Sequence, residues 1–103
     1  MTPLYALKAR LTILRQPASP PIDPRALALG ALGWVLAEDD RAERLLSLTG
    51  LTPDALREGL GDDAILGAVI EFLCAHEPDL VAASETLGVT PAQLAATLER
   101  LNP

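Results

Sequence analysis

The single histidine of this chain and a few of its acidic residues lie where helices are expected to meet. His76 and Glu77 form the one histidine–acid pair, and acids also fill the equivalent place earlier in the chain, at Glu38, Asp39 and Asp40. A zinc or di-iron site needs several histidine or carboxylate ligands spaced on facing helices. One histidine and a few acids at a helix end do not meet that requirement. We interpret them as a solvated helix junction and expect neither a metal nor a cofactor.

The potential nucleophiles also lack the surroundings that catalysis requires. Ser19, Ser47 and Ser84 stand in no nucleophile-elbow context, and the sequence has no glycine-rich phosphate-binding loop. The single cysteine, Cys74, lies in an apolar run, which predicts a small buried hydrophobic residue. One cysteine also suits a reducing cytoplasm. We therefore expect a cytoplasmic protein that is not an enzyme and has no small-molecule substrate.

Residues 1–15 combine a stripe of leucines with basic side chains. The leucines recur at i, i+3, i+7 and i+10, which places them on one face of a helix, while Lys8, Arg10 and Arg15 lie off that face. Such a segment could fold back on its own domain or across a homodimer, insert into a groove of a partner protein, or lie on an anionic membrane. The membrane is the least favoured of these. The predicted contact residues are Leu4, Leu7, Leu11, Leu14, Arg10 and Arg15.

The stretch "LGVTPAQLAATLERL", residues 87–101, resembles half of a helix-turn-helix motif. Binding to nucleic acid also requires cations, yet residues 78–103 carry three acids and one arginine. On the exposed face of the would-be recognition helix, only Gln93 could contact a base edge strongly. A helix-turn-helix nucleic-acid binder over residues 79–101 is therefore the less favoured alternative to a protein-interaction module.

The charge and composition point to the same class of protein. Half of the 103 residues are apolar and only 3% are aromatic, and alanine and leucine dominate, which favours a helical domain with one core. The net charge is −6, but residues 1–25 carry +3 and the remainder −9. The negatively charged remainder of the chain repels phosphate backbones, so any attraction to acidic surfaces depends on the N-terminal segment. The longest apolar run, residues 26–37, is too short to cross a bilayer and predicts a helix buried on nearly all sides.

Helix caps and prolines divide the chain. Residues 16–24, "QPASPPIDP", are rich in proline and predict a linker between the basic segment of residues 1–15 and a helical domain of residues 25–103. Helix starts are expected at Asp23-Pro24, Asp62, and Thr52-Pro53, and at Thr90-Pro91 with a capping box to Gln93. The predicted helices span residues 24–37, 40–48, 53–60, 63–76, 79–87 and 91–101.

An offset of 38 residues relates the two halves of this domain. "GLTPDAL" begins at Gly50 and "GVTPAQL" at Gly88, and the same offset pairs Trp34 with Phe72. We interpret residues 26–60 and 64–98 as two pseudo-repeats of a three-helix unit, which predicts an all-α, six-helix bundle. The two apolar helices should pack against each other at the centre, with Trp34 and Phe72 in equivalent buried places. Because they lack side chains, Gly30, Gly33 and Gly67 should let the backbones of these two helices approach closely.

The chain from Ala26 to Leu101 resembles a bacterial family known as domain of unknown function 3572. The resemblance lies in "ALGWVLAEDD", in "RLLSLTGLTPDALR", and in an apolar helix that leads into "HEPDLVAASETLGVTP". It covers about three-quarters of the chain and leaves out residues 1–25. It implies a short, helical, cytoplasmic protein and supplies no activity or binding residues to carry over.

Overall fold

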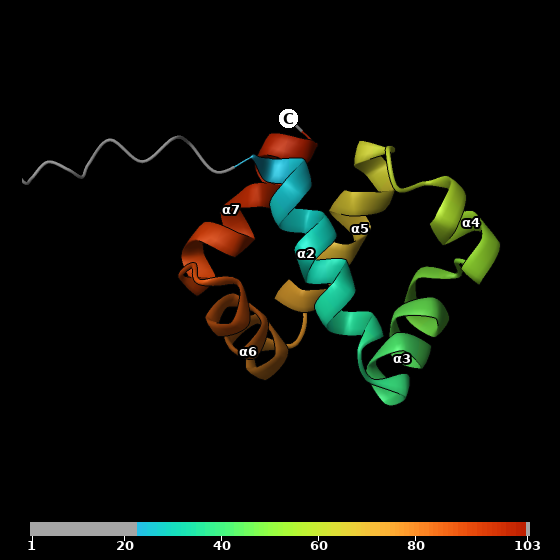
Figure 1. Cartoon of the computed structure of the whole chain (residues 1–103), viewed down its shortest axis with the longest axis horizontal. Helices are drawn as coiled ribbons and strands as arrows, with labels where there is room; N and C mark the ends of the chain where they lie inside the picture. The colour runs from blue at the N-terminus through green and yellow to red at the C-terminus, as the bar shows by residue number, and fades with distance from the viewer. Residues whose placement is uncertain (1–22, 103) are drawn as a thin grey trace, which may run out of the picture.

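The caps expected from the sequence mark where helices begin. In the computed structural model, which describes residues 23–102, the side chains of Asp23, Thr52, Asp62 and Thr90 each accept a hydrogen bond from a backbone N–H of the following first turn. These bonds satisfy amide groups that have no partner inside a helix. Between residues 23 and 102 the chain forms six α-helices and no strand (Figure 1): α2 (Pro24–Leu36), α3 (Asp39–Thr49), α4 (Pro53–Glu58), α5 (Asp63–Cys74), α6 (Glu77–Leu87) and α7 (Pro91–Leu101).

The all-α, six-helix prediction is confirmed, with small shifts of the helix ends. α7 has the predicted bounds, and the largest differences are at α4, α5 and α6. α4 ends at Glu58 because Gly59 takes the C-cap position, and α5 ends at Cys74, two residues early. α6 begins two residues before the prediction, at Glu77, since Pro78 falls in the first turn, where its missing N–H breaks no helical bond.

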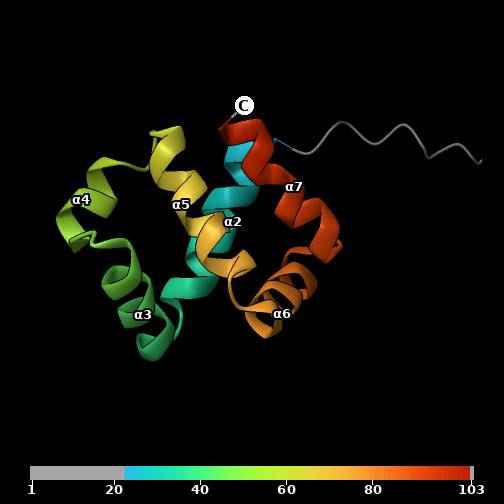
Figure 2. The same ribbon diagram turned by 180° about the vertical axis from the view of Figure 1, so that it is seen from behind.

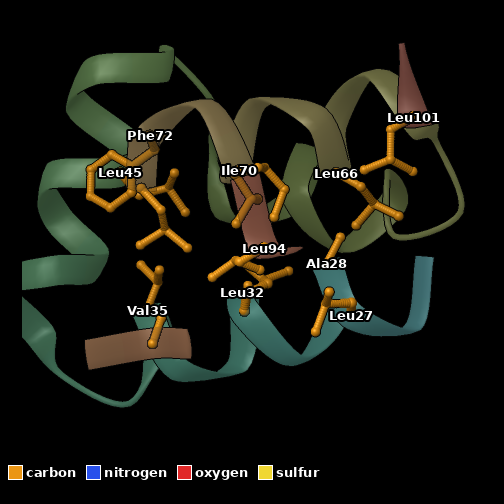
Figure 3. Close-up of a cluster of buried hydrophobic side chains, with 14 of the residues drawn as sticks. Leu27, Ala28, Leu32, Val35, Leu45, Leu66, Ile70, Phe72, Leu94 and Leu101 are labelled. Carbon is orange, nitrogen blue, oxygen red and sulfur yellow. The ribbon is translucent and has the colours of Figure 1, made fainter. Parts of the chain in front are cut away.

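α2 and α5 form the centre of the molecule and run in the same direction. Their first turns are joined by Arg25 and Asp63, whose Nε and Oδ1 atoms lie 2.7 Å apart. Figure 3 shows side chains of both helices in one buried cluster, with Leu66 toward one end and Phe72 toward the other. Leu45 of α3 and Leu94 of α7 complete this cluster from either side, and both are fully buried. The central packing of the two apolar helices is as predicted.

α2 buries one face and not nearly its whole surface. Leu27, Ala28, Ala31, Leu32 and Val35 are buried. Leu29 and Leu36 are exposed, and Trp34 is half-buried, unlike Phe72. The prediction of a helix buried on nearly all sides was wrong, because the apolar run is long enough to hide the polar–apolar pattern that normally marks a solvent face. Trp34, predicted to be buried in a place equivalent to that of Phe72, is only partly buried and packs against the core from its edge.

The glycines of the central helices do not serve a close approach of α2 to α5. A Cβ atom on Gly30 would lie 2.8 Å from Cδ2 of Leu87 in α6, and one on Gly67 would clash with the side chain of Asn102 after α7. A Cβ atom on Gly33 would meet nothing within 4 Å. Gly30 and Gly67 therefore make room for the outer elements, and Gly33 faces open space.

The outer helices cover the central pair unequally. α4 and α7 lie at opposite edges with α2 and α5 between them (Figures 1 and 2). α7 packs against α2, α5 and α6 and buries Leu94, Thr97 and Leu101. α4 has six residues against eleven in α7 and buries only Leu56. No helix within residues 23–102 is long and apolar enough to cross a membrane.

Candidate interaction surface

The residues predicted to make contacts lie outside the described part of the chain. Leu4, Leu7, Leu11, Leu14, Arg10 and Arg15 all precede residue 23, as do the basic segment of residues 1–15 and most of the linker of residues 16–24. Their prediction stays a prediction. Within residues 23–102, hollowed surfaces lie in and around α3, α5 and α6.

An apolar groove runs between α3 and α5. It encloses about 430 Å³ and is lined by residues of the last turn of α3 and of the second half of α5, which are Leu48, Thr49, Ala68, Glu71, Phe72 and Ala75. Phe72 is 7% exposed and forms its buried side, whereas Leu48 at the rim is 73% exposed. We call these six residues the α3–α5 groove. The groove thus offers an accessible leucine beside a mostly buried aromatic ring.

The end of α3 fixes the position of Leu48 at the rim. Thr49 Oγ1 donates a hydrogen bond to the carbonyl oxygen of Leu45 at 2.6 Å, and the backbone N–H of Gly50 donates one to the carbonyl oxygen of Leu46 at 2.9 Å. Gly50 has a left-handed backbone, with φ of 75°, and turns the chain away toward α4. Leu48 stands in this last turn of α3, and its side chain stays exposed.

A second hollow, mostly acidic, adjoins this groove. It encloses about 560 Å³ and is lined by Glu38, Asp40, Arg41, Glu43, Arg44, Ser47 and Asp79. We call these residues the acidic hollow, since four carboxylates outnumber two guanidinium groups. Arg44 connects it to the groove, because its guanidinium lies 5.6 Å from the centre of the Phe72 ring. The apolar groove and the acidic hollow are therefore neighbours, with Phe72 and Arg44 side by side between them.

Both arginines of the acidic hollow are already engaged. Arg44 Nη2 lies 2.7 Å from Asp79 Oδ2 and so joins α3 to α6. Arg41 stacks 3.6 Å from the centre of the Trp34 ring, donates to the Trp34 carbonyl oxygen and lies 3.2 Å from Glu38 Oε2. The carboxylates of Asp40 and Glu43 form no ion pair in the described chain. They remain available to a cation from elsewhere.

Among residues 23–102, no cluster of three or more histidine, cysteine or acidic side chains could hold a metal ion. His76 takes the N-cap position of α6 with an exposed side chain, and its carbonyl oxygen accepts bonds from the backbone of Asp79 and Leu80. Ser84 is buried, and its hydroxyl donates to the carbonyl oxygen of Val81 at 2.8 Å. The exposed His76 side chain forms no capping hydrogen bond, and the Ser84 hydroxyl is satisfied within α6.

Cys74 is exposed, and its prediction as a buried hydrophobic residue was wrong. It is the last residue of α5, where the helix emerges from between its neighbours. Partial burial of the thiol, followed by the negative charge of Glu71, raises the pKa of Cys74 above its ordinary value. The thiol stays protonated near neutral pH, so accessibility is not accompanied by nucleophilic activation.

The helix-turn-helix segment uses its one base-reading candidate for another purpose. Gln93 Oε1 accepts a hydrogen bond from the backbone N–H of Thr90 at 2.9 Å. In return, the Thr90 hydroxyl accepts a hydrogen bond from the backbone N–H of Gln93. This capping box was predicted and is confirmed. The rest of the exposed surface of α7 offers two alanines and one ion of each sign, at Ala92, Ala96, Glu99 and Arg100.

Sequence reasoning missed the α3–α5 groove. Leu48 follows Leu45 by three residues and so appears to belong to the same buried face. Its exposure depends on which elements pack over the last turn of α3, and the local sequence carries no signal for that.

The comparisons with known proteins identify a family. The model described as "Protein of unknown function (DUF3572)" matches residues 22–103, so this chain belongs to that family, in agreement with the resemblance seen in the sequence. Neither the curated proteins nor the solved structures contain a match.

Proposed function

We propose that this chain is a non-catalytic protein-interaction module that acts in the cytoplasm. Its family is of unknown function, so the proposal is based on the surfaces of the chain itself. The observation that carries this proposal is the α3–α5 groove, with Leu48 73% exposed beside a buried Phe72. Burial of an exposed leucine by a partner contributes about 1.5–3 kcal/mol to binding.

The shape and chemistry of the surface favour a helix as the bound element. A groove between two helices accepts apolar side chains spaced at i, i+3 or i+4, as in other helix-in-groove complexes. The adjoining acidic hollow favours basic residues next to those apolar anchors, because Asp40 and Glu43 have no ion-pair partner in residues 23–102. The partner is thus a protein, or a second copy of this chain, that presents an amphipathic basic helix.

The internal duplication belongs to this proposal. α3 and α6 share their bounds at an offset of 38, as do the first residues of α4 and α7. Gly50 and Gly88 also end their helices with the same left-handed backbone, at φ of 75° and 76°. These correspondences support two copies of one three-helix unit. The third helix differs between the copies, with eleven residues in α7 and six in α4.

Binding to nucleic acid remains the rival function, and no feature of the described surface favours it. The net charge of −6 opposes a phosphate backbone, and Gln93 is held in the capping box. Binding to duplex DNA should be undetectable at physiological salt in an electrophoretic shift assay. Micromolar affinity that falls steeply with salt would replace the interaction proposal.

Affinity capture with the full chain and two matched variants tests the interaction proposal. Leu48→Glu places a charge at the rim of the groove, whereas Leu29→Glu places the same charge on exposed surface of α2 that lines neither hollow. We expect a protein captured by the wild-type chain and by Leu29→Glu to be lost with Leu48→Glu. Equal capture by all three chains would contradict a role for the groove.

A further inference from the structure

The surface formed by the α3–α5 groove and the acidic hollow matches a segment of this same chain. We propose that residues 4–15 cover the groove intramolecularly, so that the protein occupies its own binding site until a partner displaces the segment. This inference rests on the proposed function and names the first occupant of the site.

The apolar part of the match lies in leucine spacing. Leu4, Leu7, Leu11 and Leu14 define one face of a helix, and a groove between two helices accepts such a face. The groove offers the exposed side chain of Leu48 and the ring of Phe72 as contacts. Burying the leucines there removes two apolar surfaces from water in one contact.

The charged part of the match lies in the opposite signs of the two surfaces. Residues 1–22 carry three basic side chains and no acid, whereas the acidic hollow holds four carboxylates and two arginines. Glu71 lines the groove itself and is exposed. In a helix, Lys8 and Arg15 lie on one flank of the leucine stripe and Arg10 on the other, so either orientation of the stripe brings a cation toward these carboxylates.

The length of the connecting chain permits this contact within one molecule. Residues 16–22 extend over roughly 22 Å at about 3.1 Å per residue. They join α2 at Asp23, and the first turns of α2 and α5 are tied together by Arg25 and Asp63. Phe72 lies nine residues further along α5, about 14 Å at 1.5 Å per residue. A tether that spans this distance gives the segment an effective concentration near millimolar, which favours its own groove over that of a second copy.

The single cysteine allows the contact to be measured directly. Cys74 is exposed, is the only cysteine in the chain and stands beside Ala75 of the groove. A nitroxide attached to Cys74 of the full-length, ¹⁵N-labelled chain broadens amide signals close to it. We expect the signals of residues 4–15 to lose most of their intensity and to regain it when the nitroxide is reduced. Absence of this broadening overturns the proposal.

Matched variants show which surfaces make the contact. Leu48→Glu in the groove, or Leu7→Asp with Leu11→Asp in the segment, should restore the signals of the segment. Leu29→Glu should not, and neither should Ala9→Asp with Thr12→Asp, which adds the same charge off the leucine stripe. Dispersed signals from residues 23–102 confirm that each variant is folded. Broadening that survives both groove and stripe variants overturns the proposal.

A mixed sample separates the chain's own segment from that of a second copy. The ¹⁵N-labelled chain without nitroxide is combined with unlabelled chain that carries the nitroxide. Intramolecular contact leaves the segment signals at full intensity in this sample. If they lose intensity here as well, as in the chain that carries both labels, the occupant is a second copy and the intramolecular proposal fails.

The same variants keep this inference distinct from the proposed function. If Leu48→Glu abolishes partner capture while no broadening is found, the module binds partners and the self-covering fails. If broadening is found while Leu48→Glu leaves capture unchanged, the interaction function assigned to the groove fails. If the groove binds partners and residues 4–15 also cover it, Leu7→Asp with Leu11→Asp uncovers the groove and increases partner capture.

Discussion

At the scale of single residues, Gly50 and Gly88 are the two positions where the described backbone requires glycine. Both have positive φ and end α3 and α6, and no other residue between 23 and 102 has a left-handed backbone. A Cβ atom in this conformation approaches the following carbonyl oxygen. We therefore expect Gly88→Ala to lower the free energy of unfolding by about 1–2 kcal/mol, measured by urea denaturation.

Gly33 provides the matched control for this prediction. It lies inside α2, and a Cβ atom there meets nothing within 4 Å. Gly33→Ala should raise the free energy of unfolding by about 0.5–1 kcal/mol, because alanine restricts the unfolded chain and adds no clash. If Gly88→Ala and Gly33→Ala change the free energy of unfolding in the same direction, backbone conformation does not determine the effect of alanine at these positions.

The ion pair of Arg25 and Asp63 predicts a pH dependence. The hydrogen bond from the guanidinium, together with its charge, lowers the pKa of the Asp63 carboxyl below its ordinary value in the folded protein. The pair therefore contributes stability above the unfolded pKa, and this contribution is lost as pH falls through the lower folded value. In Arg25→Gln, the Asp63 titration followed by NMR should move to higher pH. A titration that does not move would show that the guanidinium is not the cause.

At the scale of helices, the capping box of α7 is the strongest local signal in the chain. Thr90 and Gln93 exchange two side-chain-to-backbone hydrogen bonds, whereas Thr52 at α4 accepts one. α7 also buries Leu94, Thr97 and Leu101 in the core. Thr90→Ala should lower the free energy of unfolding by about 1 kcal/mol, and Thr90→Ser by less, because serine keeps the accepting hydroxyl. Thermal unfolding followed by circular dichroism measures both, and equal losses would contradict the role of the hydroxyl.

The helices themselves could be predicted because their starts are determined locally. Asp23, Thr52, Asp62 and Thr90 act through bonds to residues two or three positions away, so their effect is visible in the sequence. The ends were less predictable. α4 stops at Glu58 although Leu60 continues the apolar spacing, since Gly59 and Gly61 make further helix unfavourable.

At the scale of the whole molecule, prediction failed wherever exposure depends on how helices are covered. Leu48 and Cys74 both lie in apolar surroundings in the sequence, yet both are exposed because nothing packs over the ends of α3 and α5. The α3–α5 groove results from packing between segments about 20 residues apart in the chain. Local spacing carries no information on that arrangement.

The arrangement of the core predicts that the domain folds without the N-terminal segment. Every buried apolar residue of the described chain lies between Leu27 and Leu101, and Asp23 caps α2 by a bond to Arg25. Deletion of residues 1–20 leaves all these contacts and uncovers the α3–α5 groove. We expect the shortened chain to keep its helical circular dichroism and a single cooperative thermal transition, because cooperativity follows from the shared core. A broad, non-cooperative transition would place residues 1–20 in the core, and the segment could then not act as a displaceable cover.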